Sequence, residues 1–211
     1  MISLSDLRQF KTNGRKFSCL TCYDASMAKA MELAEVDTIL IGDSLGMAIQ
    51  GRDSTLPVTV EDMAYHTAAV RRGNQHAFIM TDLPFMSYAT LNDALSSSKT
   101  VMQAGAQMVK MEGGAWLSEI VTVLTRNGIP VCVHLGLTPQ SVHVFGGYKL
   151  QARTREAADQ LIADCKAVVE AGAALLLLEC VPAQLGKEIS ELFPHIPVIG
   201  IGAGVDTDGQ V

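Results

Sequence analysis

The chain has 211 residues, of which 48% are hydrophobic and 18% charged, so it can bury a substantial core in one globular domain over residues 1–211. Its formal net charge of −6 and its scattered basic residues argue against a nucleic-acid partner, because binding to phosphates needs clustered lysines and arginines. No apolar run reaches the roughly 20 residues of a membrane span, so we expect no membrane partner and a small molecule as ligand.

Short, nearly continuous apolar runs alternate with amphipathic segments along the chain. The seven runs are residues 17–23, 37–43, 76–82, 106–113, 130–136, 173–180 and 196–204. Helical spacing of apolar residues occurs in residues 25–35, 60–73, 90–105, 116–128 and 155–172. Apolar runs without polar alternation are typical of parallel strands that helices cover on both faces. The pattern therefore predicts an α/β fold.

Alternating strands and helices form either an open doubly wound sheet or a (β/α)₈ barrel. A G-x-G-x-x-G loop after the first strand would favour the open dinucleotide-binding sheet, but Tyr23 and Asp24 stand there instead. The glycines of residues 200–204 have a different spacing, which fits a tight turn and a close backbone approach to a ligand equally well. Only seven strands are visible before Val211, so we expect the eighth βα unit to be missing and the first and seventh strands to keep unpaired edges.

The amino terminus and the cysteines both indicate a cytoplasmic protein. Residues 1–17 place acidic and basic groups before any apolar stretch, which is the wrong order for a secretory signal. The five cysteines are an odd number, so free buried thiols are expected rather than disulfides. Cys19 and Cys22 spell C-x-x-C within a predicted strand, where residues three apart point to opposite faces and cannot readily share a metal ion.

Polar side chains stand at the ends of the predicted strands. These residues are Tyr23, Asp24, Asp43, Ser44, Asp82, Lys110, Glu112, His134 and Glu179. In a (β/α)₈ barrel the carboxyl ends of all strands converge on one mouth, whereas an open sheet would spread the same residues along its edge. The pattern therefore favours a barrel with a functional site at its mouth.

Several of these residues have a purely structural alternative. Asp43, Ser44 and Asp82 could cap the helices that follow their strands. His134 could be a hydrogen-bonded core histidine. Each role remains open when the residues are considered singly.

The remaining polar residues are harder to explain by structure alone. Lys110 and Glu112 face the same side of one strand among apolar neighbours, and a buried charge needs a partner or a function. Glu179 ends the run LLLLE, where a desolvated carboxylate would suit a general base. Carboxylates without a cluster of cysteines or histidines indicate a hard cation, and Mg²⁺ would keep positions open for water and substrate.

Long strings of the sequence resemble the ketopantoate hydroxymethyltransferase family of pantothenate biosynthesis. The resemblance runs in order from about Phe17 to the end of the chain. It rests on LIGDSLGM (40–47), QGRDSTLPVTVEDMAYHTAAVRRG (50–73), DLPFMSYAT (82–90), GAQMVKMEGG (105–114), VCVHLGLTPQSVHVFGGYK (131–149), LLLLECVP (175–182) and IPVIGIGAG (196–204).

The resemblance implies a fold, an assembly and a reaction. The fold is a (β/α)₈ barrel of the phosphoenolpyruvate/pyruvate superfamily, in a cytoplasmic homo-oligomer that is often a homodecamer. The reaction transfers a hydroxymethyl group from 5,10-methylenetetrahydrofolate to 3-methyl-2-oxobutanoate, which gives 2-dehydropantoate and tetrahydrofolate.

The resemblance also implies roles for single residues. Its magnesium-site carboxylates match Asp43, Asp82 and Glu112. Its substrate contacts match Asp43, Ser44, Asp82 and Lys110. Glu179 matches the general base, and we add His134 as a candidate substrate contact. Residues 136–153 are long for a βα loop, so they would form a lid or folate-side wall, with an ordinary surface loop as the alternative.

Two other functions compete with this interpretation. A Mg²⁺-dependent 2-oxo acid lyase of the same superfamily, such as isocitrate lyase or phosphoenolpyruvate mutase, would use a similar barrel, but the chain has no Cys-Gly-His string of the lyase type. A catalytically silent barrel could bind folate or an oxo acid as a regulator. The intact set of strand-end residues argues against the silent barrel, and turnover would exclude it.

Overall fold

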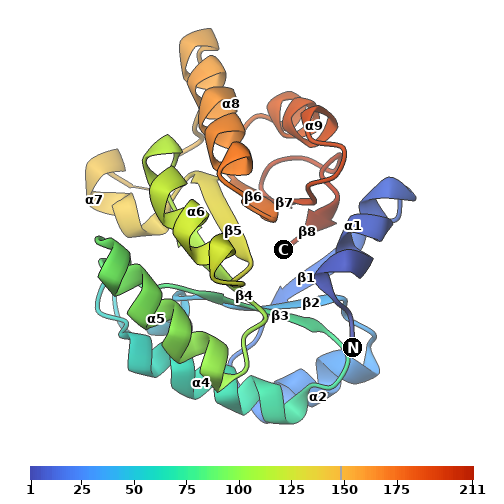
Figure 1. Ribbon diagram of the computed structural model, residues 1–211, viewed down its shortest axis with the longest axis vertical. Coiled ribbons are helices and arrows are strands. Elements are labelled where there is room, and N and C mark those ends of the chain that lie inside the picture. Colours follow the sequence, from blue (N-terminus) through green and yellow to red (C-terminus); the bar gives the residue numbers. More distant parts are fainter. Residues whose placement is uncertain (148) are drawn as a thin grey trace.

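The computed structural model describes residues 1–147 and 149–211, and its centre is a closed barrel of eight parallel strands (Figure 1). The strands follow one another around the barrel in chain order, and β8 pairs with β1. They are β1 (Phe17–Thr21), β2 (Thr38–Ile41), β3 (Phe78–Asp82), β4 (Met108–Glu112), β5 (Val131–Gly136), β6 (Leu175–Glu179), β7 (Val198–Ile201) and β8 (Gly209–Gln210). The predicted α/β barrel is confirmed.

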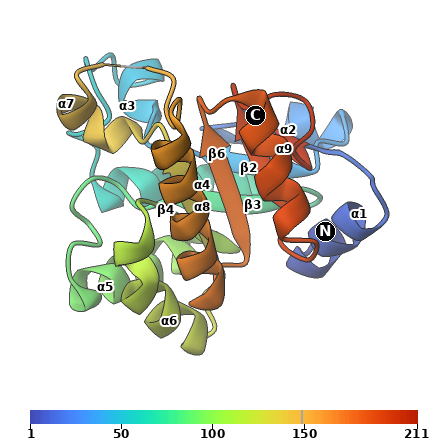
Figure 2. The ribbon, with the colours of Figure 1, turned by 90° about the horizontal axis from the view of Figure 1, so that it is seen from above.

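Helices surround the barrel, and all five predicted helices are present among them (Figure 1). The helices are α1 (Leu4–Thr12), α2 (Ala25–Leu33), α3 (Leu45–Ala48), α4 (Val60–Gly73), α5 (Leu91–Ala104), α6 (Ser118–Arg126), α7 (Val142–Phe145), α8 (Arg155–Glu170) and α9 (Ala183–Leu192), with 3₁₀ turns η1 (Ala115–Leu117) and η2 (Pro139–Ser141). The side view shows α3 and α7 beyond the carboxyl ends of the strands and α1 toward the opposite end (Figure 2). Neither α1 nor α9 was among the predicted helices.

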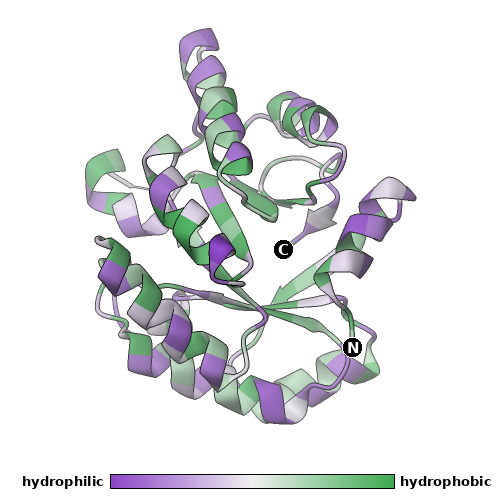
Figure 3. Ribbon diagram, viewed as in Figure 1, coloured by the Kyte–Doolittle hydropathy of each residue, from purple (hydrophilic) through white to green (hydrophobic). Residues whose placement is uncertain are grey.

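Alternation along the strands divides the core into two layers. Outward side chains such as Ile39 and Val109 pack under the helices, and Figure 3 shows how apolar the strands are. The inward side chains of the strands are Phe17, Cys19, Leu40, Phe78, Met80, Met108, Cys132, Leu175, Leu177 and Ile199. Lys110 and Glu112 lie two and four residues beyond Met108, so they point into the barrel as the next layers toward its mouth.

The eighth βα unit is incomplete, as expected, because no helix follows β8 among the described residues, but the expected unpaired edges of the first and seventh strands were wrong, because the strand of this unit is present. β8 pairs in parallel with both of its neighbours, and Gly209 stands beside Phe17 of β1 and Ile199 of β7. The first and seventh strands are therefore both paired with β8. Residues 202–208 reach β8 from β7 without a helix. A strand of two residues without an apolar run has no periodic signal that sequence analysis could detect.

The cysteines and glycines behave as local packing predicts. All five cysteines are free; Cys19 lies in the inner core layer and Cys22 in the outer one, which confirms that they face opposite sides. Within residues 200–204, Gly204 has a φ of +87°, and a Cβ there would lie 2.5 Å from the Cβ of Ala183. A tight packed turn accounts for this glycine. No helix in the described part of the chain is long and apolar enough to cross a membrane.

Candidate active site

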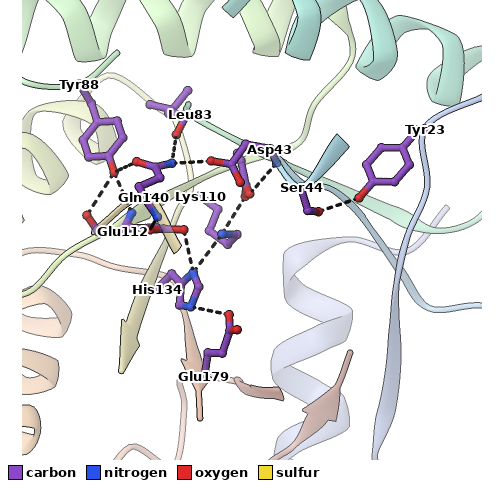
Figure 4. A network of polar contacts seen from close by, with 11 residues as sticks. Tyr23, Asp43, Ser44, Leu83, Tyr88, Lys110, Glu112, His134, Gln140 and Glu179 are labelled. Atoms are coloured by element: carbon purple, nitrogen blue, oxygen red, sulfur yellow. Dashed lines mark hydrogen bonds and ion pairs between the residues drawn. The ribbon is translucent and has the colours of Figure 1, made fainter. Parts of the chain in front are cut away.

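A cavity of about 230 Å³ lies at the carboxyl ends of the strands. Its charged and polar lining includes Asp43, Ser44, Asp82, Lys110, Glu112, His134 and Glu179. Thus all seven site residues expected from the sequence meet in one place, although they come from β2 through β6 and the turns that follow them. Figure 4 shows Asp43, Ser44, Lys110, Glu112, His134 and Glu179 from this set. The convergence that a barrel mouth predicts is confirmed.

The register of β3 and β4 places Lys110 beside Asp82. Asp82 of β3 is paired in register with Lys110 of β4, and Lys110 Nζ lies 2.9 Å from Asp82 Oδ1. Both side chains are buried. Burial alone would lower the pKa of Lys110, but the charges of Asp82, Glu112 and Asp43 outweigh it and raise that pKa. These carboxylates therefore favour the charged form of Lys110.

Asp43 is held by its neighbours in the mouth. Its backbone N–H donates to Asp82 Oδ2 at 3.1 Å, and its own Oδ2 accepts a hydrogen bond of 2.9 Å from Gln140 Nε2. Burial, reinforced by the charges of Asp82 and Glu112, raises the pKa of Asp43 to about 8. Burial likewise raises the pKa of Asp82, against the effect of Lys110.

Helix capping does not explain Asp43, Ser44 or Asp82. Ser44 begins α3 without a side-chain capping hydrogen bond, and its Oγ lies 2.7 Å from the hydroxyl of Tyr23 instead. The longer helices α4 and α5 are capped by Thr59 and Thr90 rather than by Asp43 or Asp82. Asp24, in contrast, is a true cap, because its Oδ1 accepts the backbone N–H of Met27.

His134 lies between two carboxylates. Its Nε2 is 3.2 Å from Glu179 Oε2, and its Nδ1 is 3.5 Å from Glu112 Oε1 and 3.2 Å from Lys110 Nζ (Figure 4). Burial and Lys110 would lower the pKa of His134, but the neighbouring carboxylates of Glu112 and Glu179 outweigh them and raise it. The side chain of Glu179 is 16% exposed, against 4% for Glu112, so Glu179 is the more accessible carboxylate.

Two buried residues that no sequence pattern indicated connect this network. Gln140 of η2 and Tyr88, which precedes α5, are hydrogen-bonded to each other, and both contact Glu112. Gln140 stands inside the string 131–149 that carries the family resemblance, but it lies beyond the end of β5 in a loop. No periodic pattern marks such a residue, because its partners are fixed only by the fold.

The chemistry of this donor set fits a magnesium ion. Three buried carboxylates, Asp43, Asp82 and Glu112, lie around Lys110, and burial, reinforced by repulsion from the other two carboxylates, raises the pKa of Asp43. A divalent cation with oxygen ligands would relieve that repulsion. Among the described residues no three Asp, Glu, His or Cys side chains stand close enough to hold a metal ion by themselves. The arrangement therefore suits an ion bound by one or two carboxylates together with water and substrate, which is the usual coordination of Mg²⁺.

Two further cavities adjoin the mouth at Glu112. The larger, of about 420 Å³, is lined by Glu112, Gly113, Gly114, Trp116, Leu135, Gly136, Thr138, Ser141, Phe145, Gln151, Ala152, Ala157, Gln160, Leu161 and Asp164. The smaller, of about 290 Å³, is lined by Phe85, Met86, Tyr88, Ala89, Glu112, Trp116, Gln140 and Ser141. Residues 136–153, expected as a lid or wall, thus contribute to both cavities; position 148 of this stretch lies outside the described residues.

Comparison with known proteins gives one consistent family. The family model for ketopantoate hydroxymethyltransferase matches residues 1–211. A 3-methyl-2-oxobutanoate hydroxymethyltransferase of Acinetobacter baumannii (strain AYE) is 90% identical over the whole chain, which covers 78% of that relative. A protein of the same name from Psychrobacter sp. (strain PRwf-1) is 66% identical, with the same coverage of both chains.

Solved structures support the fold at low sequence identity. A putative phosphonomutase from Burkholderia cenocepacia J2315 has a TM-score of 0.73 at 15% identity, with 94% of this chain and 83% of that chain covered. A phosphonopyruvate hydrolase in complex with oxalate and Mg²⁺ has a TM-score of 0.71 at 14% identity, with coverage of 95% and 72%. At these identities the likeness concerns the fold alone, and it agrees with the barrel described above.

Proposed function

Because the chain belongs to the ketopantoate hydroxymethyltransferase family, we propose that its barrel mouth adds a hydroxymethyl group to 3-methyl-2-oxobutanoate. The one-carbon donor is 5,10-methylenetetrahydrofolate, and the products are 2-dehydropantoate and tetrahydrofolate. The observation that carries this proposal is the gathering of a lysine, a histidine and four carboxylates in one cavity of about 230 Å³, a size suited to a small oxo acid.

The oxo acid binds beside the buried carboxylates. Asp43, Asp82 and Glu112 would hold Mg²⁺ directly or through water, and the bound ion would polarise the carboxylate and keto oxygens of the substrate. Ser44 and His134 line the same cavity and would orient the substrate by hydrogen bonds. The raised pKa of Asp43 supports this arrangement, because its carboxylate has more to gain from a cation than an ordinary surface aspartate.

Proton transfer at C3 is assigned to Glu179. Its carboxylate faces the cavity and is more exposed than that of Glu112, so it is free to accept a proton from carbon. His134 Nε2 lies 3.2 Å from the Glu179 carboxylate. Lys110, whose charged form the neighbouring carboxylates favour, stabilises the negative charge that develops on the substrate oxygen as the proton leaves. The nucleophilic C3 then forms a bond to the one-carbon unit, whose two bonds to folate nitrogens break, and one water molecule supplies the hydroxyl oxygen. The proton taken from C3 and one proton of that water go to the two nitrogens of tetrahydrofolate.

The folate approaches through the cavity of about 420 Å³ that shares Glu112 with the mouth. Residues 136–153 form part of its wall, through Thr138, Ser141, Phe145, Gln151 and Ala152. Trp116 is 63% exposed at this cavity and offers an aromatic face for a flat ring system. A ligand in this cavity would extend toward the oxo acid beside Glu112.

An omission experiment tests the proposed function. Formation of 2-dehydropantoate should require both 3-methyl-2-oxobutanoate and 5,10-methylenetetrahydrofolate, and it should stop when the metal is removed with a chelator and return with Mg²⁺. Cleavage of isocitrate or of a phosphonate, with no folate-dependent product, would favour the lyase alternative. Binding of either substrate without any turnover would indicate the silent barrel.

We also propose that the chain forms a homo-oligomer. Helices α2 and α4 pack against each other on one side of the barrel, and they leave Met27, Leu33 and Tyr65 exposed by 52%, 77% and 69%. Large apolar side chains that remain exposed commonly mark a subunit contact. Light scattering coupled to size-exclusion chromatography measures the assembly, and a monomer at micromolar concentration would contradict this proposal.

A further inference from the structure

Gln140 makes hydrogen bonds with two of the three carboxylates assigned to magnesium. Its side-chain Nε2 donates to Asp43 Oδ2 at 2.9 Å, and its backbone N–H donates to Glu112 Oε2 at 2.9 Å (Figure 4). These two acidic residues belong to different strand ends, and Gln140 reaches both from η2. One residue therefore sets the relative orientation of two carboxylates that are far apart in sequence.

The amide of Gln140 can point only one way in this environment. Its Nε2 uses its second hydrogen on the carbonyl oxygen of Leu83 at 2.9 Å, and its Oε1 accepts the hydroxyl of Tyr88 at 2.6 Å. A flipped amide would place oxygen against two acceptors, which costs free energy in a side chain that is only 7% exposed. The orientation in which Nε2 donates to Asp43 is thus the only one in which every polar atom of the amide has a partner.

Tyr88 holds the amide oxygen of Gln140. Its hydroxyl donates to Gln140 and accepts the backbone N–H of Glu112 at 3.3 Å, so both hydrogen-bonding functions of this buried phenol are used. Its ring lies stacked at 6.4 Å from that of Trp116, which covers it on the side of the adjoining cavities. Tyr88 and Gln140 therefore form a rigid support between the aromatic wall and the acidic cluster.

We propose that Gln140 is a positioning residue of the magnesium site, and that with Tyr88 it holds Asp43 and Glu112 in the orientation that binds the ion. This inference rests on the proposed function, because it takes these carboxylates as the ligands. Groups that orient metal ligands by hydrogen bonding commonly contribute a factor of about 10–100 to metal affinity. Gln140 itself does not touch the reacting atoms.

The test measures metal affinity directly, without turnover. Mn²⁺ binding to the metal-free protein is followed by electron paramagnetic resonance, where free and bound Mn²⁺ give different signals. Gln140→Met keeps the length and packing of the side chain but removes its hydrogen bonds to Asp43, Leu83 and Tyr88. We expect this variant to bind Mn²⁺ about 10–100-fold more weakly, and Tyr88→Phe to show a smaller loss in the same direction.

A matched glutamine separates positioning from a general loss of stability. Gln107 accepts the backbone N–H of Ile79 at 3.1 Å, near the amino end of β4 and away from the acidic cluster. Gln107→Met should lower the melting temperature without changing the affinity for Mn²⁺. In steady-state assays, Gln140→Met should raise the KM for Mg²⁺, and saturating Mg²⁺ should restore most of kcat.

Each outcome has a definite meaning. Equal Mn²⁺ affinity in Gln140→Met and the unsubstituted protein would overturn the positioning role while leaving the magnesium site intact. Equal loss of affinity in Gln140→Met and Gln107→Met would overturn it as well, because the effect would then follow stability. If the unsubstituted protein binds no Mn²⁺ or Mg²⁺, the magnesium site of the proposed function fails, and this inference fails with it.

Discussion

At the scale of single residues, the carboxylates of the mouth divide into two groups. Asp43, Asp82 and Glu112 are deeply buried and hydrogen-bonded, whereas Glu179 is more exposed and has the imidazole of His134 beside it. A base must reach a proton on carbon and then release it, so accessibility favours Glu179. This division by environment, rather than by residue type, underlies the roles that we assign.

Glu179→Gln should abolish most turnover while substrate binding survives. The amide keeps the shape of the side chain but cannot accept a proton, so we expect kcat to fall by roughly 10²–10⁴ with little change in affinity for the oxo acid. Exchange of the C3 proton of 3-methyl-2-oxobutanoate for deuterium, followed by NMR without folate, isolates this step. Exposed Glu188 offers the matched control, since Glu188→Gln should leave exchange unchanged. Exchange at the unsubstituted rate in Glu179→Gln would point to His134 as the base.

Trp116→Ala should weaken folate binding selectively. Its ring lines both cavities that adjoin the mouth, and it does not line the mouth itself. Loss of one aromatic contact of about 1.4 kcal/mol corresponds to a tenfold change, so the KM for 5,10-methylenetetrahydrofolate should rise by about that factor. The KM for 3-methyl-2-oxobutanoate, measured in the same assay, is the internal control. A rise in both constants would show that Trp116 supports the whole site rather than the folate.

At the scale of elements, α1 shows what local capping contributes. Ser3 and Asp6 form a reciprocal capping box, and Leu7 of the same helix is fully buried against the lower end of the barrel. Lys11 near its other end forms an ion pair with Asp208, which directly precedes β8. Helix α1 therefore ties the amino terminus to the strand that closes the barrel.

The capping box gives α1 a pH-dependent contribution to stability. Hydrogen bonds from the hydroxyl and then the backbone N–H of Ser3 lower the pKa of Asp6 below its usual 3.8. Because the folded-state pKa is the lower one, the contribution is present above the unfolded pKa and is lost as the pH falls through the folded pKa. Asp6→Asn should therefore lower the melting temperature at neutral pH, and this difference should shrink below pH 3.8. A difference that stays constant down to strongly acid pH would contradict the charge-based explanation.

At the scale of the whole molecule, a very short last strand closes the barrel. β8 contributes two residues, and Asp208 before it accepts hydrogen bonds from Lys11, Ser190 and the backbone of Val198. These contacts bring the last strand between β7 and β1. Without β8 the two neighbouring strands would expose unpaired edges, which favours association between chains.

Gly209→Ala should destabilise the closed barrel. A Cβ at Gly209 would lie 2.5 Å from a ring carbon of Phe17, which is only 3% exposed inside the barrel. Overpacking of this kind costs roughly 1–3 kcal/mol of unfolding free energy, measurable by urea denaturation. Adding Phe17→Leu should recover part of that loss, because the smaller side chain makes room for the new methyl group. An unchanged unfolding free energy in Gly209→Ala would show that β8 does not pack against β1 as described.

The sequence by itself determined the barrel class and most of its site. The apolar runs at the seven longer strands are local, so their burial on both faces can be recognised without knowing their partners. The i and i+2 spacing of Lys110 and Glu112, and the positions of Asp43, Asp82 and Glu179 at strand ends, follow from the same local geometry. The strand-end pattern predicts that these residues lie together at one mouth, and the family resemblance then implies their chemical roles.

Only the tertiary structure decided the remaining features. β8 is defined by its pairing with strands near residues 17 and 199, not by its own two residues. Gln140 acts on Asp43 across 97 positions of sequence, and Tyr88 on Gln140 across 52. Periodicity reports which face of a strand or helix is buried, but a single loop side chain has no period. Its partner is chosen when closure of the barrel brings distant strand ends together.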